Sequence, residues 1–158
     1  MQETYPELLI PLDEIGVDEH MAIRMYDSEE FHQWVADSFF GQASYATPEL
    51  GYVAPPLDGI WATAPYLHNG SVPSIAVLLE SNKRPQCWTW SYDSKDYNQS
   101  TLGWNYSESS CHSEMSDDGE KALVYDTQNE GYGNQGHTYG DALSTSDRTA
   151  LLEYLKTL

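Results

Sequence analysis

The sequence is poor in basic residues. The 158 residues include only 7 Lys and Arg but 25 Asp and Glu, which gives a formal net charge of -18. A field of this sign repels a phosphate backbone, so we expect no nucleic-acid partner, whereas a cationic protein or a divalent cation would be attracted. The same balance is also typical of a solvated acidic surface that keeps an exported protein soluble.

Long apolar runs are absent as well. Nowhere do eighteen apolar residues follow one another, and residues 1–6 hold no basic segment that leads into an apolar run. We therefore predict neither a membrane span nor a signal peptide within this sequence. If the protein is exported, its signal stands upstream or has been removed, so we expect the chain to be a fragment of a longer protein or one product of a split gene.

The motifs of several common enzyme classes are missing too. The sequence contains no Gly-x-Gly-x-x-Gly, no P-loop, no Gly-x-Ser-x-Gly and no His-Glu-x-x-His. The pair Cys111-His112 looks like the end of a Cys-x-x-Cys-His haem attachment motif, but the position three before Cys111 is Glu108. The chain cannot attach a haem through two thioether bonds.

Two cysteines are present, Cys87 and Cys111, and an isolated pair suggests one disulfide, with two unrelated thiols as the alternative. They flank a polar stretch rich in aromatic residues, among them Trp88, Trp90 and Tyr92. Aromatic faces suit sugars and flat apolar ligands. One function to consider is therefore a secreted, disulfide-stapled module that binds carbohydrate or a similar ligand without haem.

Three helices are predicted from apolar spacing and capping residues. Residues 28–40 form an amphipathic helix with acidic residues at its start, and Gly41 is its stop. A second helix begins at the cap Ser71, holds Pro73 in its first turn and runs to residue 79. The third follows the capping box of Ser144 and Asp147, with leucines on one face up to the C-terminus.

The remaining segments read as extended chain or loop. Residues 5–12 are apolar and bracketed by prolines and form an extended segment, and residues 51–71 form an ordered loop rich in proline and turn glycines. Residues 87–136 show no sustained period, so we predict an irregular loop with at most one or two short strands, for instance at 122–125. So long a loop usually means function or insertion.

Five histidines are candidate ligands, at positions 20, 32, 68, 112 and 137. His20 and His32 lie in charged helical segments and are expected at the surface. His137 stands in a glycine-rich stretch that would let backbone approach a flat ligand, or that forms a simple turn. His68 follows a stiff Ala-Pro-Tyr segment and is either a ligand-facing ring or a structural histidine bonded to backbone carbonyls.

The segment 51–73, Gly-Tyr-Val-Ala-Pro-Pro-Leu-Asp-Gly-Ile-Trp-Ala-Thr-Ala-Pro-Tyr-Leu-His-Asn-Gly-Ser-Val-Pro, resembles the C-terminal haem region of di-haem cytochrome c peroxidase-like proteins. Its core at 63–71 is similar to a loop of the bacterial peroxidases, and the longer version is similar to the branch that contains the haem-dependent rubber oxygenases. Arg84-Pro85, Tyr92-Asp93, the Asn-Gln-Gly-His-Thr-Tyr-Gly segment 134–140 and residues 143–158 also resemble that branch.

This resemblance implies an exported c-type cytochrome with two haem domains. In the rubber-oxygenase branch a C-terminal histidine is the distal axial ligand of the second haem iron, and the match falls on His137. The pocket would be lined by five residues of the first loop: Trp61, Pro65, Tyr66, His68 and Asn69. A bis-histidine iron is coordinatively full and suits electron transfer. The peroxidases use a methionine instead, but Met115 lies in a polar, acidic stretch.

From these observations we predict a mainly α fold, a cytochrome c-like haem domain fragment with short helices and long ordered loops. Residues 1–158 would be the C-terminal portion of a single such domain, with a polar loop insertion at about 87–125. Haem c would be attached upstream or on a separate haem-bearing chain, in the periplasm or outside the cell, and a cationic redox partner fits the charge. If the full protein is an enzyme, it is a haem-dependent oxidoreductase, and the sequence leaves open hydrogen peroxide, dioxygen with a polyisoprene-like substrate, or another cytochrome.

Overall fold

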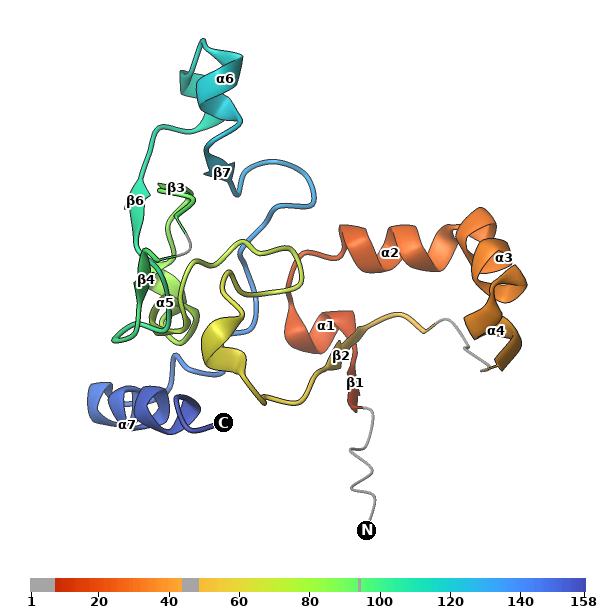
Figure 1. Cartoon of the computed structure of the whole chain (residues 1–158), viewed down its shortest axis with the longest axis horizontal. Helices are drawn as coiled ribbons and strands as arrows, with labels where there is room; N and C mark the ends of the chain where they lie inside the picture. The colour runs from red at the N-terminus through yellow and green to blue at the C-terminus, as the bar shows by residue number, and fades with distance from the viewer. Residues whose placement is uncertain (1–7, 44–48, 94) are drawn as a thin grey trace.

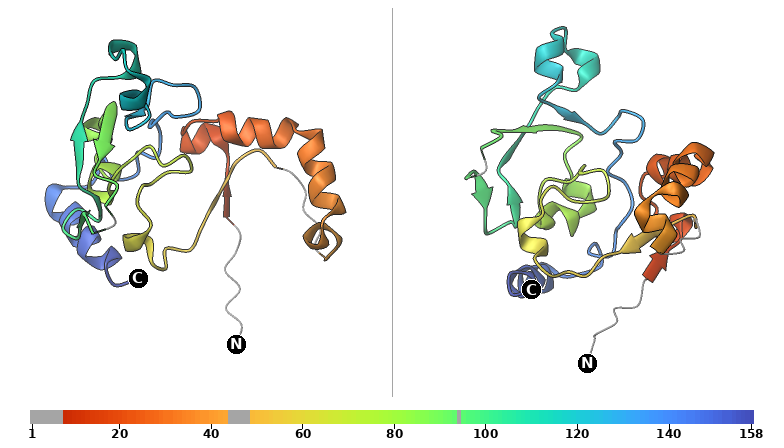
Figure 2. Two further views of the ribbon diagram at one scale, coloured as in Figure 1. Left: turned by 45° about the horizontal axis from the view of Figure 1, so that its top comes forward. Right: turned by 45° about the vertical axis from the view of Figure 1, so that its right-hand side comes forward.

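The computed structural model describes residues 8–43, 49–93 and 95–158. Figure 1 shows an arm of three helices, α2 (His20–Asp27), α3 (Glu29–Asp37) and α4 (Phe39–Ala43), on one side of the molecule. The other side is a body that contains α5 (Ile75–Leu78) and α7 (Thr145–Leu155). The two further views in Figure 2 show the same separation.

The chain enters the fold through an extended segment, as predicted. Strand β1 (Leu8–Ile10) pairs antiparallel with β2 (Tyr52–Ala54), so that Ile10 lies opposite Tyr52. Residues 5–7 of the predicted segment lie outside the described residues. A short helix α1 (Leu12–Ile15) follows and ends at Gly16 in the left-handed conformation, with φ of 64°. This turn directs the chain into the arm.

The arm differs from the single predicted helix over 28–40. Ser28 caps α3, its Oγ accepting a hydrogen bond from the Phe31 N–H, but the helix stops at Ser38, whose backbone is extended. Gly41 lies inside α4 and does not end a helix. A Cβ at Gly41 would come within 2.0 Å of the Val35 carbonyl oxygen, so glycine is needed where α4 folds back on α3. The acidic start of the helix was predicted correctly, but its predicted end at Gly41 was wrong.

The hydrophobic core lies in the body. Six buried residues form it, from the 51–73 loop, α5, the 97–104 hairpin and α7: Tyr66, Val72, Ile75, Leu79, Leu102 and Leu155. Burial of such side chains is the main stabilising term of a small domain. By contrast, no side chain of α2, α3 or α4 is buried among the described residues, and Trp34 and Phe39 are 69% and 80% exposed.

Helix α7 begins at the predicted cap, Ser144, but the reciprocal bond of a full capping box is replaced by one from the Ser144 hydroxyl to the Asp147 carboxylate. The Ser144 Oγ accepts a hydrogen bond of 3.2 Å from the Asp147 N–H, and the leucine face of the helix packs against the core. Helix α5 begins later than predicted, with Ser74 as its N-cap. Ser71 is fully buried, and Pro73 precedes the helix instead of standing in its first turn.

Residues 87–126 form small antiparallel sheets where an irregular loop was predicted. Strand β3 (Cys87–Trp90) lies between β6 (Tyr106–Glu108) and β7 (Tyr125–Asp126), and β4 (Tyr97–Asn98) pairs with β5 (Gly103–Trp104). Between β6 and β7 lie η3 (His112–Glu114) and α6 (Asp118–Lys121). The predicted Cys87–Cys111 disulfide is confirmed, with Cα atoms 5.3 Å apart.

The fold is therefore not mainly α, and that prediction was wrong. Helices account for 37% and strands for 15% of the structure, including the one-turn helices η1 (Ile60–Ala62) and η2 (Ser81–Lys83). The sheets escaped prediction because strands of two to four residues are too short to show an alternating pattern. Among the described residues, no helix is long and apolar enough to cross a bilayer.

Candidate functional site

The side chain of Asn69 joins the 51–73 loop to the glycine-rich stretch 131–140, which contains His137. Its amide nitrogen donates to the carbonyls of Gly131 and Gly133 at 3.2 and 2.8 Å, and its amide oxygen accepts from the Ser71 N–H. The Tyr125 hydroxyl donates to the Asn69 carbonyl at 2.8 Å. Segments more than sixty residues apart in the sequence are thus brought together, as a shared site would require.

A second link is the half-buried side chain of Arg84, which sequence reasoning did not select as a site residue. Its guanidinium donates to five backbone carbonyls, those of Val77 (3.4 Å), Leu78 (2.9 Å), Asn134 (2.6 Å), Gly136 (2.7 Å) and His137 (3.0 Å). Burial lowers the pKa of Arg84, but an arginine in a protein stays charged. The planar fork therefore fixes the loop of His137 to the end of α5.

His137 is held by its backbone, while one nitrogen of its ring has no hydrogen-bonding partner among the described residues. Its N–H donates to the Ile15 carbonyl at 2.8 Å, and its φ of 47° is left-handed. The ring meets Tyr139 edge to face at 5.0 Å, and the buried Nδ1 has no hydrogen-bonding partner among the described residues. Burial, with a contribution from Arg84, lowers the pKa of His137, which favours the neutral imidazole that ligates iron.

His68 shows the same combination. Its ring stacks on Tyr52, with centroids 4.3 Å apart, and its buried Nε2 is also unpartnered within the described part of the chain. Burial lowers the pKa of His68. The alternative prediction for His68 was a structural ring bonded to backbone carbonyls. No such hydrogen bond is present among the described residues. Each of these half-buried imidazoles thus has one buried nitrogen with no partner among the described residues, and because such nitrogens are normally satisfied, each is a candidate ligand.

The other predicted lining residues have structural roles of their own. Tyr66 is buried in the core and donates to the Ile60 carbonyl at 3.0 Å, and Pro65, after a cis peptide bond, packs closely against Gly70. Trp61 is 44% exposed, and its ring nitrogen donates to the carbonyl of Leu158 at 3.0 Å. These residues shape the loop, and Trp61 leaves part of its ring open.

Glycine is needed near His137 because an earlier part of the chain, at residues 16–17, lies directly against this loop. A Cβ at Gly136, where φ is 74°, would come within 2.3 Å of the Gly16 carbonyl carbon. The neighbouring Gly133 N–H donates to the buried carboxylate of Asp18 at 3.4 Å. Burial would raise the pKa of Asp18, but hydrogen bonds from His20 and Gly133 outweigh it and lower that pKa. The loop is therefore pressed against residues 16–18.

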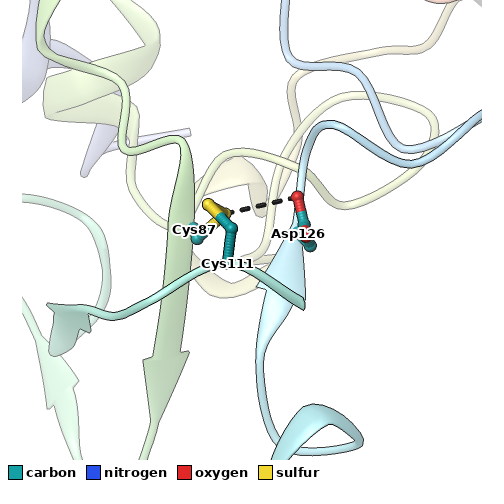
Figure 3. A group of neighbouring side chains, drawn as sticks. All are labelled: Cys87, Cys111 and Asp126. Carbon is teal, nitrogen blue, oxygen red and sulfur yellow. Dashed lines mark hydrogen bonds between the residues drawn. A yellow bond between two sulfur atoms is a disulfide. The ribbon is translucent and has the colours of Figure 1, made fainter. Parts of the chain in front are cut away.

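Cys87, Cys111 and the buried Asp126 are the described residues that come close enough together to suggest a metal site (Figure 3). The two sulfurs are bonded to each other and so are not thiolates. The Asp126 carboxylate oxygen lies 3.3 Å from the Cys87 sulfur, but a disulfide sulfur has no hydrogen to donate, so this is a close contact only. The cluster cannot bind a metal while the disulfide is intact.

Comparison with known proteins agrees with this geometry in part. Residues 51–89 match the family described as RoxA-like, cytochrome c-like. That range includes His68, Asn69 and Arg84, but not the loop of His137. The match confirms a cytochrome c-like region in the chain, while a position as the C-terminal part of a di-haem peroxidase stays a prediction.

Two relatives come from Sinorhizobium fredii. The uncharacterized protein y4iJ is 38% identical over 119 residues, which covers 69% of this chain and 18% of that protein. The uncharacterized protein y4iM is 32% identical over 130 residues, which covers 70% of this chain and 28% of that protein. The chain therefore matches less than a third of either relative.

Proposed function

We propose that this chain completes the haem pocket of a c-type cytochrome and serves electron transfer, with His137 as an axial ligand of the iron. The observation that carries the proposal is the buried Nδ1 of His137, which like the Nε2 of His68 has no hydrogen-bonding partner among the described residues, in a loop that Asn69 joins to the loop of His68. Residues 1–158 would form the C-terminal portion of one cytochrome c-like domain, with the 87–125 segment inserted into it.

The chain's own residues would hold the ring of His137 in place for the iron. Arg84 and the Ile15 carbonyl fix the backbone on both sides of this residue, so little freedom remains to be lost on ligation. When bound, haem c supplies one-electron redox chemistry, and a second histidine on the iron suits electron transfer more than oxygen activation. Peroxidase or oxygenase activity of a whole protein would belong to a different haem.

A haem-bearing partner is part of the proposal, because this chain lacks Cys-x-x-Cys-His. The arm of α2–α4 supports it, since Trp34 and Phe39 expose large apolar surfaces that a covering chain would bury. We infer that the upstream region or a separate haem-bearing chain packs there. The disulfide supports a periplasmic or extracellular location, and the charge of -18 favours a cationic redox partner.

The test uses a haem c peptide that carries Cys-x-x-Cys-His and therefore provides one histidine ligand and an open sixth position. The full chain is titrated into the ferric peptide, and the optical and electron paramagnetic resonance spectra are recorded. We expect conversion of the iron to the low-spin, bis-histidine form. No conversion with the unmodified chain would contradict the proposal.

Three variants locate the ligand. His137→Ala should abolish the conversion, while His32→Ala, on the arm, should leave it unchanged. An unchanged low-spin spectrum with His137→Ala would overturn ligation by this residue. Conversion that is lost only with His68→Ala would assign the ligand to His68 and equally contradict our assignment.

A further inference from the structure

A pocket of about 400 Å³ opens beside the β6-β3-β7 sheet, within the range of small-molecule sites. Its walls carry four aromatic rings, those of Trp90, Tyr92, Tyr125 and Tyr132. Trp90 and Tyr92 lie 4.5 Å apart between ring centroids, and Tyr125 and Tyr132 lie 5.5 Å apart. Trp88, which the sequence suggested as a contact residue, is fully buried and cannot reach a ligand.

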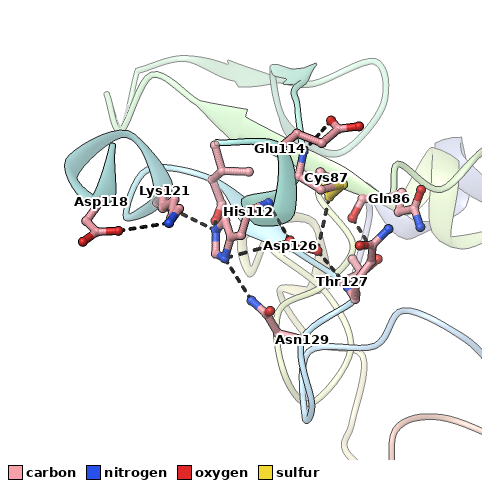
Figure 4. Close-up of polar contacts among 12 residues, drawn as sticks. Gln86, Cys87, His112, Glu114, Asp118, Lys121, Asp126, Thr127 and Asn129 are labelled. Atoms are coloured by element: carbon pink, nitrogen blue, oxygen red, sulfur yellow. Dashed lines mark hydrogen bonds and ion pairs between the residues drawn. A yellow bond between two sulfur atoms is a disulfide. The ribbon is translucent and has the colours of Figure 1, made fainter. Parts of the chain in front are cut away.

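The polar side of the pocket is built from a hydrogen-bonded set (Figure 4). The His112 Nε2 lies 3.0 and 3.1 Å from the carbonyls of Lys121 and Val124, so this nitrogen carries the proton. The Nδ1 then accepts from the Asn129 amide nitrogen at 3.1 Å. The buried carboxylate of Asp126 accepts from the His112 N–H at 2.8 Å. These bonds hold the pocket in shape before any ligand arrives.

The aromatic wall is also fixed. Tyr92 has a left-handed φ of 58°, and its hydroxyl donates to the Leu123 carbonyl at 3.2 Å. Tyr125 is fixed through its hydroxyl to Asn69. Tyr92 and Tyr132 are 54% and 50% exposed, so part of each side chain is accessible to a ligand although each ring also packs against a neighbouring ring.

The chemistry of the lining selects a class of ligand. Open aromatic faces take up the C–H faces of a sugar ring or another flat, weakly polar group. The Asn129 amide oxygen has no partner within the described structure and can accept from a hydroxyl, and the Lys121 ammonium, which pairs with Asp118 at 3.0 Å, has further N–H groups that can donate to one. The net charge of -18 disfavours an anion.

We propose that this pocket binds a neutral carbohydrate. The site contains neither His68 nor His137, so binding requires no haem and is independent of the function proposed above. It touches that site through Tyr125 and Asn69, and the two sites can therefore belong to one protein.

The test titrates the oxidised, haem-free chain with three neutral probes, cellobiose, maltose and N,N′-diacetylchitobiose, and with galacturonate as an anionic comparison. Saturation-transfer NMR on the sugar protons and tryptophan fluorescence report binding. We expect saturation transfer to the ring protons of at least one neutral probe, with little or none to galacturonate. No transfer to any of the three neutral sugars, or transfer to galacturonate of equal strength, would overturn the proposal.

Variants of exposed tyrosines test whether the sugar binds in this pocket. Tyr92→Ala and Tyr132→Ala should each weaken binding about tenfold, the usual scale for one aromatic contact. Tyr154→Ala is the matched control, because Tyr154 is 59% exposed on α7, outside the pocket lining. Equal affinities of Tyr92→Ala, Tyr132→Ala and Tyr154→Ala, in proteins with unchanged circular dichroism, would show that the sugar does not use this pocket.

Discussion

Arg84 holds the backbone of His137 through a hydrogen bond of 3.0 Å from its Nη2 to the His137 carbonyl. The same guanidinium reaches the carbonyls of Gly136, one residue earlier, and of Leu78 in α5. One side chain thus connects the core to the loop that presents the candidate iron ligand. The predictions below begin with this connection.

Replacing Arg84 with Lys should destabilise the protein. A lysine has at most three donors, all on one atom, and cannot reach five carbonyls that point from two sides. Because buried acceptors would lose their partners, we expect a loss of about 3 kcal/mol in the free energy of unfolding. Urea denaturation followed by tryptophan fluorescence measures it.

The control is Lys83→Met, which removes a cation next in sequence that pairs with Glu80 at the surface. That change should cost less than about 1 kcal/mol. Equal effects of Arg84→Lys and Lys83→Met would show that the five hydrogen bonds do not hold the loop.

Replacing Asn69 with Ala should separate the two loops. Two carbonyls, of Gly131 and Gly133, lose their donor, which should cost about 2 kcal/mol. Hydrogen exchange should accelerate in residues 131–137 more than in α7. Asn82→Ala, at an exposed position in η2, should leave exchange in both regions unchanged. Unaltered exchange at 131–137 in Asn69→Ala would refute the link.

Reducing the disulfide should lower stability by about 3.5 kcal/mol, as the chain-entropy model gives for a closed loop of this size. The cysteines are separated by 24 positions and join β3 to the segment after β6. Thermal unfolding with and without a phosphine reductant measures the change. A Cys87→Ala/Cys111→Ala double variant should melt at the same temperature with and without the reductant. If the melting temperature of the unmodified protein were also unaffected by the reductant, the disulfide would have no stabilising role.

Asp18 should contribute to the acid sensitivity of the fold. Its pKa in the folded protein is lowered from 3.8, so its contribution is fully present above that value and is lost as the pH falls through the folded pKa. Between pH 5 and the acid range, the free energy of unfolding should therefore fall more steeply in the unmodified protein than in Asp18→Asn.

The matched control for this acid titration is Asp58→Asn, at an exposed position. Its stability should follow the same steep pH dependence as the unmodified protein. Parallel curves for Asp18→Asn and Asp58→Asn would contradict a special role of the Asp18 carboxylate.

Some features of the structure could be predicted from short-range patterns. The start of α7 at Ser144 could be predicted, because a helix cap depends on residues within one turn. The isolated pair of cysteines gave the disulfide, and the Ala-Pro-Tyr-Leu-His-Asn-Gly segment gave a cytochrome c-like region. Local patterns failed for Gly41, whose need for glycine comes from the approach of Val35 on a neighbouring helix.

The features that escaped prediction depend on contacts between distant segments. Three of the five bonds of Arg84, the joining of loops by Asn69 and the contact of Asp18 with Gly133 have no pattern along the chain, because these partners lie far away in sequence. The strands of residues 87–126 are too short to show a period and form because the disulfide and the burial of Trp88 hold them together. Composition and local spacing thus established the acidic charge, the caps and the candidate histidines. The packing of remote backbone and side chains established which of those histidines have a buried ring nitrogen without a hydrogen-bonding partner among the described residues.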